Sequence, residues 1–207
     1  MRALVVYAHP KEGSYNAAIR DLILARIEGA GGEARLIDLY ARGFDPRLTA
    51  AELDGYEDLD ANMATFGDDI EALRWCDTLI FVYPTWWYGL PAILKGWLDR
   101  AWVPGVAFLM PDENGDIRPG LTNVKRIAAF TTCGASWWLT RLVGAPGKAT
   151  LLRGLRVCCA KTCRTTYAAH YLMDSSTPES RARHLARVGR KMDRLLGARH
   201  ALKEATA

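Results

Sequence analysis

The chain has 207 residues, of which 50% are hydrophobic and 24% charged, so it is long enough to fold as one globular domain with its own core. A net charge of +4 is too small to indicate nucleic-acid binding, and no apolar run reaches the ~20 residues that a membrane-spanning helix needs. The five cysteines lack the spacing of a disulfide framework or a metal site. We therefore expect free thiols, no bound metal and a cytoplasmic protein.

The first part of the chain alternates an apolar run with an amphipathic segment. Residues 3–8 are typical of a buried parallel strand. Ser14 is a suitable N-cap for a following helix, which glycines end at residues 29–32. A second strand is expected over residues 34–39, and the polar segment 41–60 is expected to form a long surface connection.

The middle of the chain repeats this alternation. Helical spacing over residues 63–75 precedes the apolar run Thr78–Tyr83, which predicts a buried strand. A further helix, with Pro91 in its first turn, is expected to end near Trp102. Between that strand and helix lies a loop with two tryptophans and a tyrosine, which core packing alone does not predict.

The last part of the chain predicts a hairpin, two strands and two helices. Asn114-Gly115 indicates a tight turn between short strands, and a fourth long strand is expected over residues 124–130. A short helix is predicted over residues 146–155 and the fifth strand over residues 156–162. A final helix should begin at Thr177 and end near residue 196. Its arginines have no binding motif beside them, and we interpret them as a solvated face: Arg183, Arg187, Arg190 and Arg194.

Strands alternating with helices predict a parallel sheet with helices on both faces. Five strands favour a flavodoxin-like three-layer α-β-α sandwich with strand order 2-1-3-4-5. We expect one flavodoxin-like domain over residues 1–197 and a C-terminal tail over residues 198–207. In this order the loops after strands one, three and four lie side by side at one sheet edge: residues 9–16, 84–89 and 131–138.

These three loops contain hydroxyls, one amide, one imidazole and several aromatic rings. The four histidines are scattered along the chain, and neither a Ser/His/Asp arrangement nor a pair of carboxylates is evident in the loops. Such loops can hold a flat conjugated cofactor, with a phosphate at the N-terminus of the first helix. The chemistry would then belong to the cofactor.

The run from Pro84-Thr85-Trp86-Trp87-Tyr88-Gly89 through Leu94-Lys95-Gly96-Trp97 resembles the flavodoxin-like NAD(P)H:quinone oxidoreductase family. The segments Ala8-His9-Pro10 and Ser14-Tyr15-Asn16 are also similar, and Thr131-Thr132-Cys133-Gly134 more loosely. The resemblance covers most of the chain to about residue 135. It implies non-covalent FAD or FMN, NAD(P)H as co-substrate, two-electron ping-pong reduction of a quinone-like acceptor, and a homodimer.

The resemblance also implies which residues surround the flavin. The phosphate side would be held by His9, Ser14, Tyr15 and Asn16. The ring side would be formed by Pro84, Thr85, Trp86, Trp87, Tyr88, Thr131, Thr132, Cys133 and Gly134. Trp137 and Trp138 are candidates for a substrate wall.

Some features of the family pattern differ in this chain. Cys133 occupies the position of one of two usual glycines, and Leu139 and Ala145 stand where some members have a tyrosine and a histidine that relay charge. No catalytic side chain is therefore assigned. The alternatives left open are packing or dimer roles for the tryptophans, FAD or FMN as cofactor, and a flavin-binding regulatory partner or electron carrier without its own turnover.

Overall fold

The computed structural model describes residues 1–111 and 115–197, and its centre is a five-stranded parallel sheet. The spatial order is β2-β1-β3-β6-β7, which in chain order of these strands is 2-1-3-4-5, as the sequence predicts. The strands are β1 (Arg2–Tyr7), β2 (Glu33–Asp38), β3 (Thr78–Pro84), β6 (Arg126–Thr132) and β7 (Arg164–His170).

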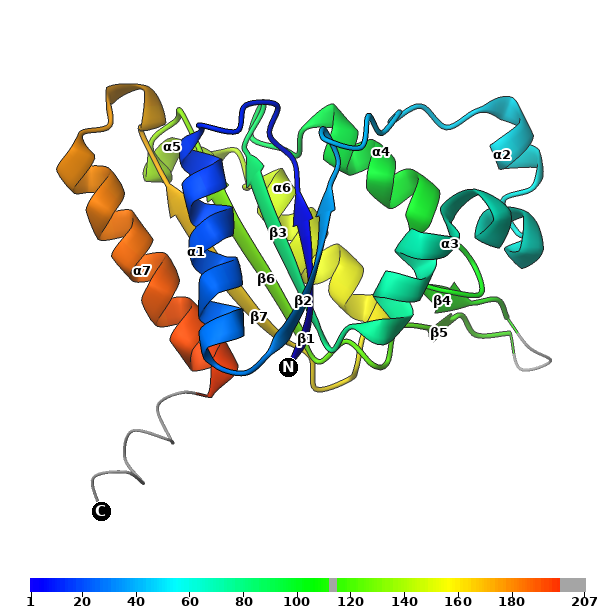
Figure 1. The fold of residues 1–207 in the computed structure, drawn as a ribbon. Coiled ribbons are helices and arrows are strands. Elements are labelled where there is room, and N and C mark those ends of the chain that lie inside the picture. The colour runs from blue at the N-terminus through cyan, green and yellow to red at the C-terminus, as the bar shows by residue number, and fades with distance from the viewer. Residues whose placement is uncertain (112–114, 198–207) are drawn as a thin grey trace, which may run out of the picture.

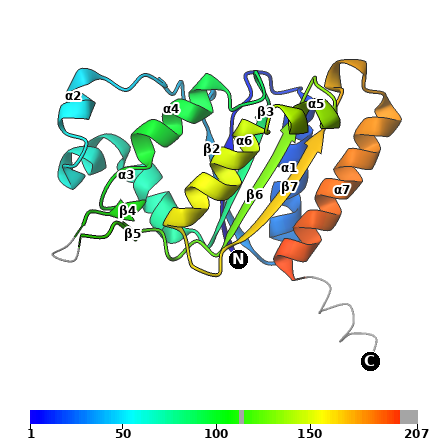
Figure 2. The same cartoon turned by 180° about the vertical axis from the view of Figure 1, so that it is seen from behind.

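Helices cover both faces of the sheet. In Figure 1, α1 (Tyr15–Gly29) and α7 (Pro178–Leu196) lie in front of the sheet. Figure 2 shows the opposite face, covered by α3 (Leu59–Trp75), α4 (Ala92–Ala101) and α6 (Pro146–Ala149). Helix α6 continues through a π turn and a 3-10 turn. The shorter elements are α2 (Ala50–Asp54), β4 (Phe108–Leu109), β5 (Arg118–Pro119), α5 (Trp137–Leu142), η1 (Thr150–Gly154), η2 (Leu155–Cys158) and η3 (Met173–Ser175).

Side-chain alternation along the central strands produces the two cores. In β1, Val5 and Tyr7 pack against α1 and α7, whereas Leu4 and Val6 pack towards α3 and α4. These strands are buried on both faces, which explains why they read as continuous apolar runs in the sequence. Within the described residues, no helix is long and apolar enough to cross a membrane.

Helix α4 anchors the segment before α2. The indole nitrogen of Trp97 donates to Asp69 Oδ1 at 2.7 Å, and Arg42 Nη1 donates to Asp69 Oδ2 at 2.9 Å. Arg100 donates to the backbone oxygen of Asp45 and to the Glu52 carboxylate. Much of the long run that resembles the oxidoreductase family therefore has a structural role, away from the loop edge.

The predicted fifth strand over residues 156–162 is wrong. Residues 155–158 form a 3-10 turn, and the strand is Arg164–His170. Val157, Cys158 and Cys159 form an apolar run, but β7 is an edge strand whose first half is exposed and polar. Edge strands lose the continuous apolar pattern that marks the central ones, so periodicity selected the wrong segment.

The other element boundaries differ less. The fourth long strand begins and ends two residues later than the predicted 124–130, and the surface connection 41–60 contains α2. A hairpin does follow α4, with Leu109 paired to Arg118. Its Asn114-Gly115 turn and the tail 198–207 involve residues outside those described.

Candidate functional site

Hydrogen bonds join the loops after β1, β3 and β6. Asn16 Nδ2 donates to Thr132 Oγ1 at 3.1 Å, and the hydroxyls of Thr85 and Thr131 lie 2.9 Å apart. The Thr85 N–H also donates to the Thr132 oxygen at 2.7 Å. The three segments that the sequence singles out therefore form one continuous edge, at the top of the sheet in Figure 1.

The first turn of α1 has an N-cap and free backbone N–H groups. Ser14 is its N-cap, and the hydroxyl accepts from the Ala17 N–H at 3.1 Å. Within the described residues, the N–H groups of Tyr15 and Asn16 have no hydrogen-bond partner. Free N–H groups at a helix N-terminus form a phosphate site. The Tyr15 side chain points elsewhere, because its hydroxyl donates to the Arg181 oxygen at 2.8 Å, so its contribution would be its backbone N–H.

His9 borders this turn as a neutral donor. Its Nδ1 accepts from the Lys11 N–H at 3.1 Å, so the neutral ring carries its hydrogen on Nε2. Partial burial, and to a smaller extent the nearby Lys11 charge, lower the pKa of His9. An Nε2–H group is a donor that suits a phosphate oxygen.

Asn16 shows the clearest sign of a missing partner. Its side chain is 3% exposed, and its Oδ1 is buried with no hydrogen-bond partner. An unpartnered buried acceptor is costly, by about 1–3 kcal/mol, unless a bound group satisfies it. A hydroxyl or N–H donor of a flavin cofactor fits this position, so the residues present fit the cofactor.

The aromatic loop is a tight and strained turn. Trp87 and Tyr88 have φ values of 47° and 62°, and Trp86 and Gly89 exchange backbone hydrogen bonds of 3.3 and 2.8 Å on either side. Positive φ at both central residues is typical of a type I′ turn, which favours asparagine and glycine. Large aromatic residues there cost about 1–3 kcal/mol each, and such strain clusters at ligand sites.

The start of α6 holds the aromatic turn in place. The Gly147 N–H donates to the Tyr88 oxygen at 3.2 Å, and a Cβ on Gly147 would lie 3.0 Å from the Gly89 carbonyl carbon. Trp86 and Trp87 are 61% and 93% exposed, so neither is a core residue. Pro84 and Thr85 are half-buried beneath them.

We expect Trp87→Asn to stabilise the protein by about 1 kcal/mol while weakening ligand binding, because asparagine tolerates positive φ better than tryptophan. Trp87 is 93% exposed and loses almost no packing on substitution. Urea denaturation of the purified variant measures the first effect, and flavin titration the second. Equal or lower stability would show that the turn is not strained.

The loop after β6 forms the opposite wall. Thr131, Thr132 and Cys133 are buried, and Gly134 is exposed. The Cys133 N–H donates to the His170 oxygen at 2.8 Å, which fixes this loop to the end of β7. A Cβ on Gly134 would lie 2.7 Å from Asp174 Oδ2, so Asp174 is a neighbour that sequence reasoning missed. Trp137 and Trp138 begin α5 and are 57% and 61% exposed beside this wall.

A buried histidine pair lies behind the site. His170 and His184 are 7% and 5% exposed, and their ring centroids are 5.3 Å apart. Tyr15 Oη lies 2.9 Å from His184 Nδ1 and donates its hydrogen to Arg181, so Nδ1 is the donor and the unpartnered His184 Nε2 is a bare acceptor. Burial, then the neighbouring His170 and Arg187, lower the pKa of His184 to about 4.

The histidine pair predicts a pH-dependent stability. Because the folded pKa of His184 is below its unfolded value of about 6.5, the unfolded chain binds more protons and the fold loses stability as pH falls below 6.5. We expect wild type to lose about 2 kcal/mol more than His184→Leu between pH 7 and pH 5. Urea denaturation at both pH values measures this difference. The same loss in both proteins would contradict the assignment.

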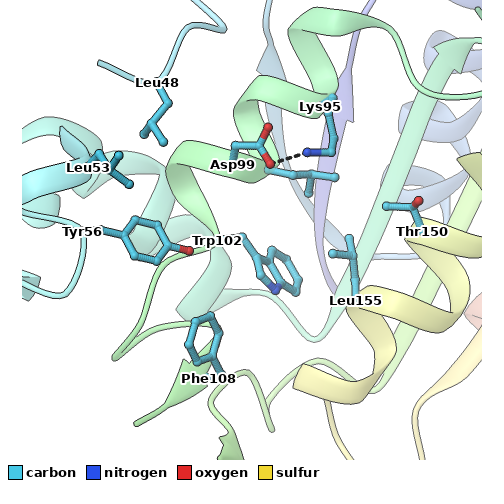
Figure 3. A pocket seen from close by; sticks show the side chains of 10 residues that line it. Leu48, Leu53, Tyr56, Lys95, Asp99, Trp102, Phe108, Thr150 and Leu155 are labelled. Atoms are coloured by element: carbon cyan, nitrogen blue, oxygen red, sulfur yellow. Dashed lines mark hydrogen bonds and ion pairs between the residues drawn. The ribbon is translucent and has the colours of Figure 1, made fainter. Parts of the chain in front are cut away.

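A separate apolar cavity of about 430 Å³ lies beside α4 (Figure 3). Leu53, Trp102 and Phe108 contribute apolar walls, and Lys95 and Asp99 form an ion pair at its rim. None of the predicted flavin-binding residues lines it. This cavity is therefore separate from the loop edge.

The groups at the loop edge can bind a planar ring and a phosphate. Within the described residues of these loops, no nucleophilic side chain lies next to a base. Within the described residues, no group of three or more His, Cys, Asp or Glu could hold a metal ion. Burial raises the pKa of Tyr83 and of Tyr167, so these tyrosines near the loop edge stay protonated.

Comparisons with known proteins show the family to which the chain belongs. A family model described as flavodoxin-like fold matches residues 1–196. The chain is 35% identical over 108 residues to "Uncharacterized NAD(P)H oxidoreductase YcaK" of Escherichia coli, covering 52% of this chain and 55% of that protein. It is 28% identical over 162 residues to human "Ribosyldihydronicotinamide dehydrogenase [quinone]", covering 70% and 69%. The chain thus spans between about half and about two thirds of these relatives.

Solved structures extend the likeness over nearly the whole chain. Smu.1420 of Streptococcus mutans superposes with a TM-score of 0.80 at 26% identity, covering 93% of this chain and 98% of that one. An NAD(P)H:quinone oxidoreductase from Methanothermobacter marburgensis superposes with a TM-score of 0.79 at 22% identity, covering 94% and 98%. At that identity the second match shows the fold alone.

Proposed function

The chain belongs to the family with the flavodoxin-like fold, and from this premise we propose that it is a flavin-dependent NAD(P)H dehydrogenase that reduces a quinone or similar acceptor. The relatives named for NAD(P)H oxidation and for quinone reduction support the proposal. The observation that carries it is the joined loop edge, with free N–H groups at α1 and the unpartnered Asn16 Oδ1.

In this proposal the chain binds and orients, and the flavin supplies a ring that can accept and donate a hydride. The N–H groups of Tyr15 and Asn16, with His9 Nε2, hold the phosphate. Asn16 Oδ1 accepts a hydrogen bond from the cofactor. The turn around Trp87 and the loop around Cys133 position the ring and limit water access. No side chain is required to take or give a proton at a substrate atom.

Purified protein tests this proposal directly. We expect a yellow protein, because a bound oxidised flavin absorbs near ~450 nm. We also expect it to oxidise NAD(P)H with quinones, the two substrates using one site in turn. Parallel double-reciprocal lines would indicate ping-pong turnover, and intersecting lines would contradict it. Flavin binding without NAD(P)H consumption, with quinone, nitro or azo acceptors, would instead favour an electron carrier or a regulatory partner.

We also propose that the protein is a homodimer and that it is located in the cytoplasm. All five cysteines are free, which suits a reducing compartment. Thr150, which lines the apolar cavity of Figure 3, directly follows α6, the helix whose Gly147 contacts the aromatic turn. Leu53 on the cavity wall is 61% exposed. A second copy covering this face would also cover the exposed tryptophans. Aromatic and leucine-rich apolar surface of this kind is typical of homodimer interfaces.

We expect Leu53→Glu to convert the dimer into a monomer, because it buries a charge in the apolar contact. Light scattering after gel filtration measures the mass. Leu36→Glu on edge strand β2, where Leu36 is 41% exposed, is the matched control and should stay dimeric. A monomeric wild type, or a dimeric Leu53→Glu, would contradict this interface.

A further inference from the structure

A second cleft, of about 440 Å³, lies between the end of β7 and helix α7. Three aromatic residues contribute to it: Trp137 at the start of α5, Tyr167 in β7 and Tyr171 directly after β7. Its other side is formed by successive turns of α7, which contribute four cations: Arg187, Arg190, Lys191 and Arg194. Three of the four arginines that the sequence presents as a solvated face therefore line a cleft, and Arg183 does not.

The positive charge of this cleft is not neutralised. No carboxylate lines it, and across residues 1–111 and 115–197 none of its four cations forms an ion pair. Asp193, on the same helix, pairs instead with Arg26 of α1 at 2.5 Å. Burial, then repulsion from Arg194, Arg187 and Lys148, lower the pKa of Lys191. Uncompensated charge of one sign in a cleft concentrates anions.

Two further cations lie against the aromatic walls. Lys148 Nζ is 5.0 Å from the centre of the Tyr167 ring, and the Arg141 guanidinium carbon is 5.6 Å from that of Trp137. These contacts leave the cations close to the cleft without neutralising them. The cleft thus combines exposed aromatic surface with six nearby positive charges, the combination that binds a phosphate-bearing aromatic ligand.

The cleft adjoins the candidate site at the end of β7. Trp137 follows the Thr131–Gly134 loop, and the Cys133 N–H bonds to the His170 oxygen at the end of β7, one residue before Tyr171. None of the residues predicted at the α1 phosphate position lines this cleft, so the two anion positions are distinct. From Arg187 to Arg194, the cations extend the cleft by about 10 Å along the helix.

We propose that this cleft binds the phosphates of the nicotinamide co-substrate and makes the enzyme select NADPH over NADH. The inference rests on the proposed function, in which the dinucleotide is the multiply charged substrate and the quinone is uncharged. The nicotinamide end lies at the loop edge beside Trp137, and the adenosine 2′-phosphate lies among the α7 cations. That extra phosphate is the group that distinguishes NADPH from NADH.

Calorimetric titration of the flavin-loaded protein tests the cleft without turnover. We expect adenosine 2′,5′-bisphosphate to bind at least about 10-fold more tightly than adenosine 5′-monophosphate, since the second phosphate adds charge-assisted hydrogen bonds. Arg187→Gln and Arg190→Gln should each lose about 10-fold of that affinity. Arg183→Gln is the matched control, because Arg183 is exposed on the same helix and does not line the cleft.

Steady-state kinetics provides a second measurement. We expect kcat/KM for NADPH to exceed that for NADH, and Arg190→Gln to reduce the NADPH value by about 10-fold while leaving the NADH value within about 2-fold. Equal affinity for the two adenosine phosphates, or unchanged affinity in both cleft variants, would overturn the inference. Equal use of NADPH and NADH by an active enzyme would also overturn it and leave the proposed function intact. Absence of flavin and of any turnover would overturn the proposed function instead.

Discussion

Asn16→Asp is expected to weaken flavin binding by about 100-fold or more. Asn16 is 3% exposed in the first turn of α1, where the free N–H groups would hold the cofactor's phosphate. A carboxylate within ~5 Å of that phosphate adds a repulsion of about 3 kcal/mol at an effective dielectric constant of ~20. Fluorescence titration of apoprotein with FMN and with FAD measures the change.

The fold should tolerate this substitution, because a negative charge at a helix N-terminus interacts favourably with the helix dipole. Asn62→Asp is the matched control. Asn62 is also buried, at 7% exposure, but its Nδ2 donates to the Tyr56 oxygen at 2.9 Å on the far face of the sheet. That control should lose stability and keep flavin affinity. Unchanged flavin affinity in Asn16→Asp would remove the α1 turn from the cofactor site.

Gly96→Ala is expected to destabilise the fold by more than about 3 kcal/mol. A Cβ at residue 96 would lie 2.5 Å from the Pro46 Cα and closer still to other atoms of Pro46. Overpacking of this kind costs about 1–3 kcal/mol where neighbours can shift. Here the neighbour is backbone that Arg100 holds through the Asp45 oxygen, so relief requires moving the whole segment. Urea denaturation of wild type and variant gives the difference in unfolding free energy.

Gly67→Ala is the control within the same layer. A Cβ there would meet only the Met63 Cε, at 3.8 Å, and alanine favours helix over glycine by about 1 kcal/mol. We therefore expect this variant to be as stable as wild type or more so. Stability losses of equal size in both variants would show that Pro46 does not constrain residue 96.

The sequence predicted the buried parts of the fold well, because a strand between two helical layers must be apolar along its whole length. The runs that became β1 and β3 are of this kind, and with the number of strands they indicated the sheet order. The sequence did not predict strand β7, because one edge and half of the length of this strand face solvent. Neither burial nor alternation then distinguishes a strand from the neighbouring apolar turn at residues 155–158.

For the site, the sequence indicated which loops meet but not how they are joined. The bonds from Asn16 to Thr132 and from Thr85 to Thr131 connect residues far apart in the chain, and no local pattern signals them. The turn at Trp87 and Tyr88 contradicts ordinary turn chemistry, so propensity rules could not find it. The role of Asp69 beneath Trp97 likewise depends on packing between α3 and α4.

The bond between the Gly147 N–H and the Tyr88 oxygen couples the position of the aromatic turn to helix α6. The aromatic turn has few supports of its own, and one of them comes from the start of α6, almost 60 residues later in the chain. Shortening, lengthening or tilting α6 would shift the two tryptophans relative to the Thr131–Gly134 wall while leaving every residue of both loops unchanged. The separation between the aromatic turn and the Thr131–Gly134 wall therefore depends in part on a helix that lies outside both loops.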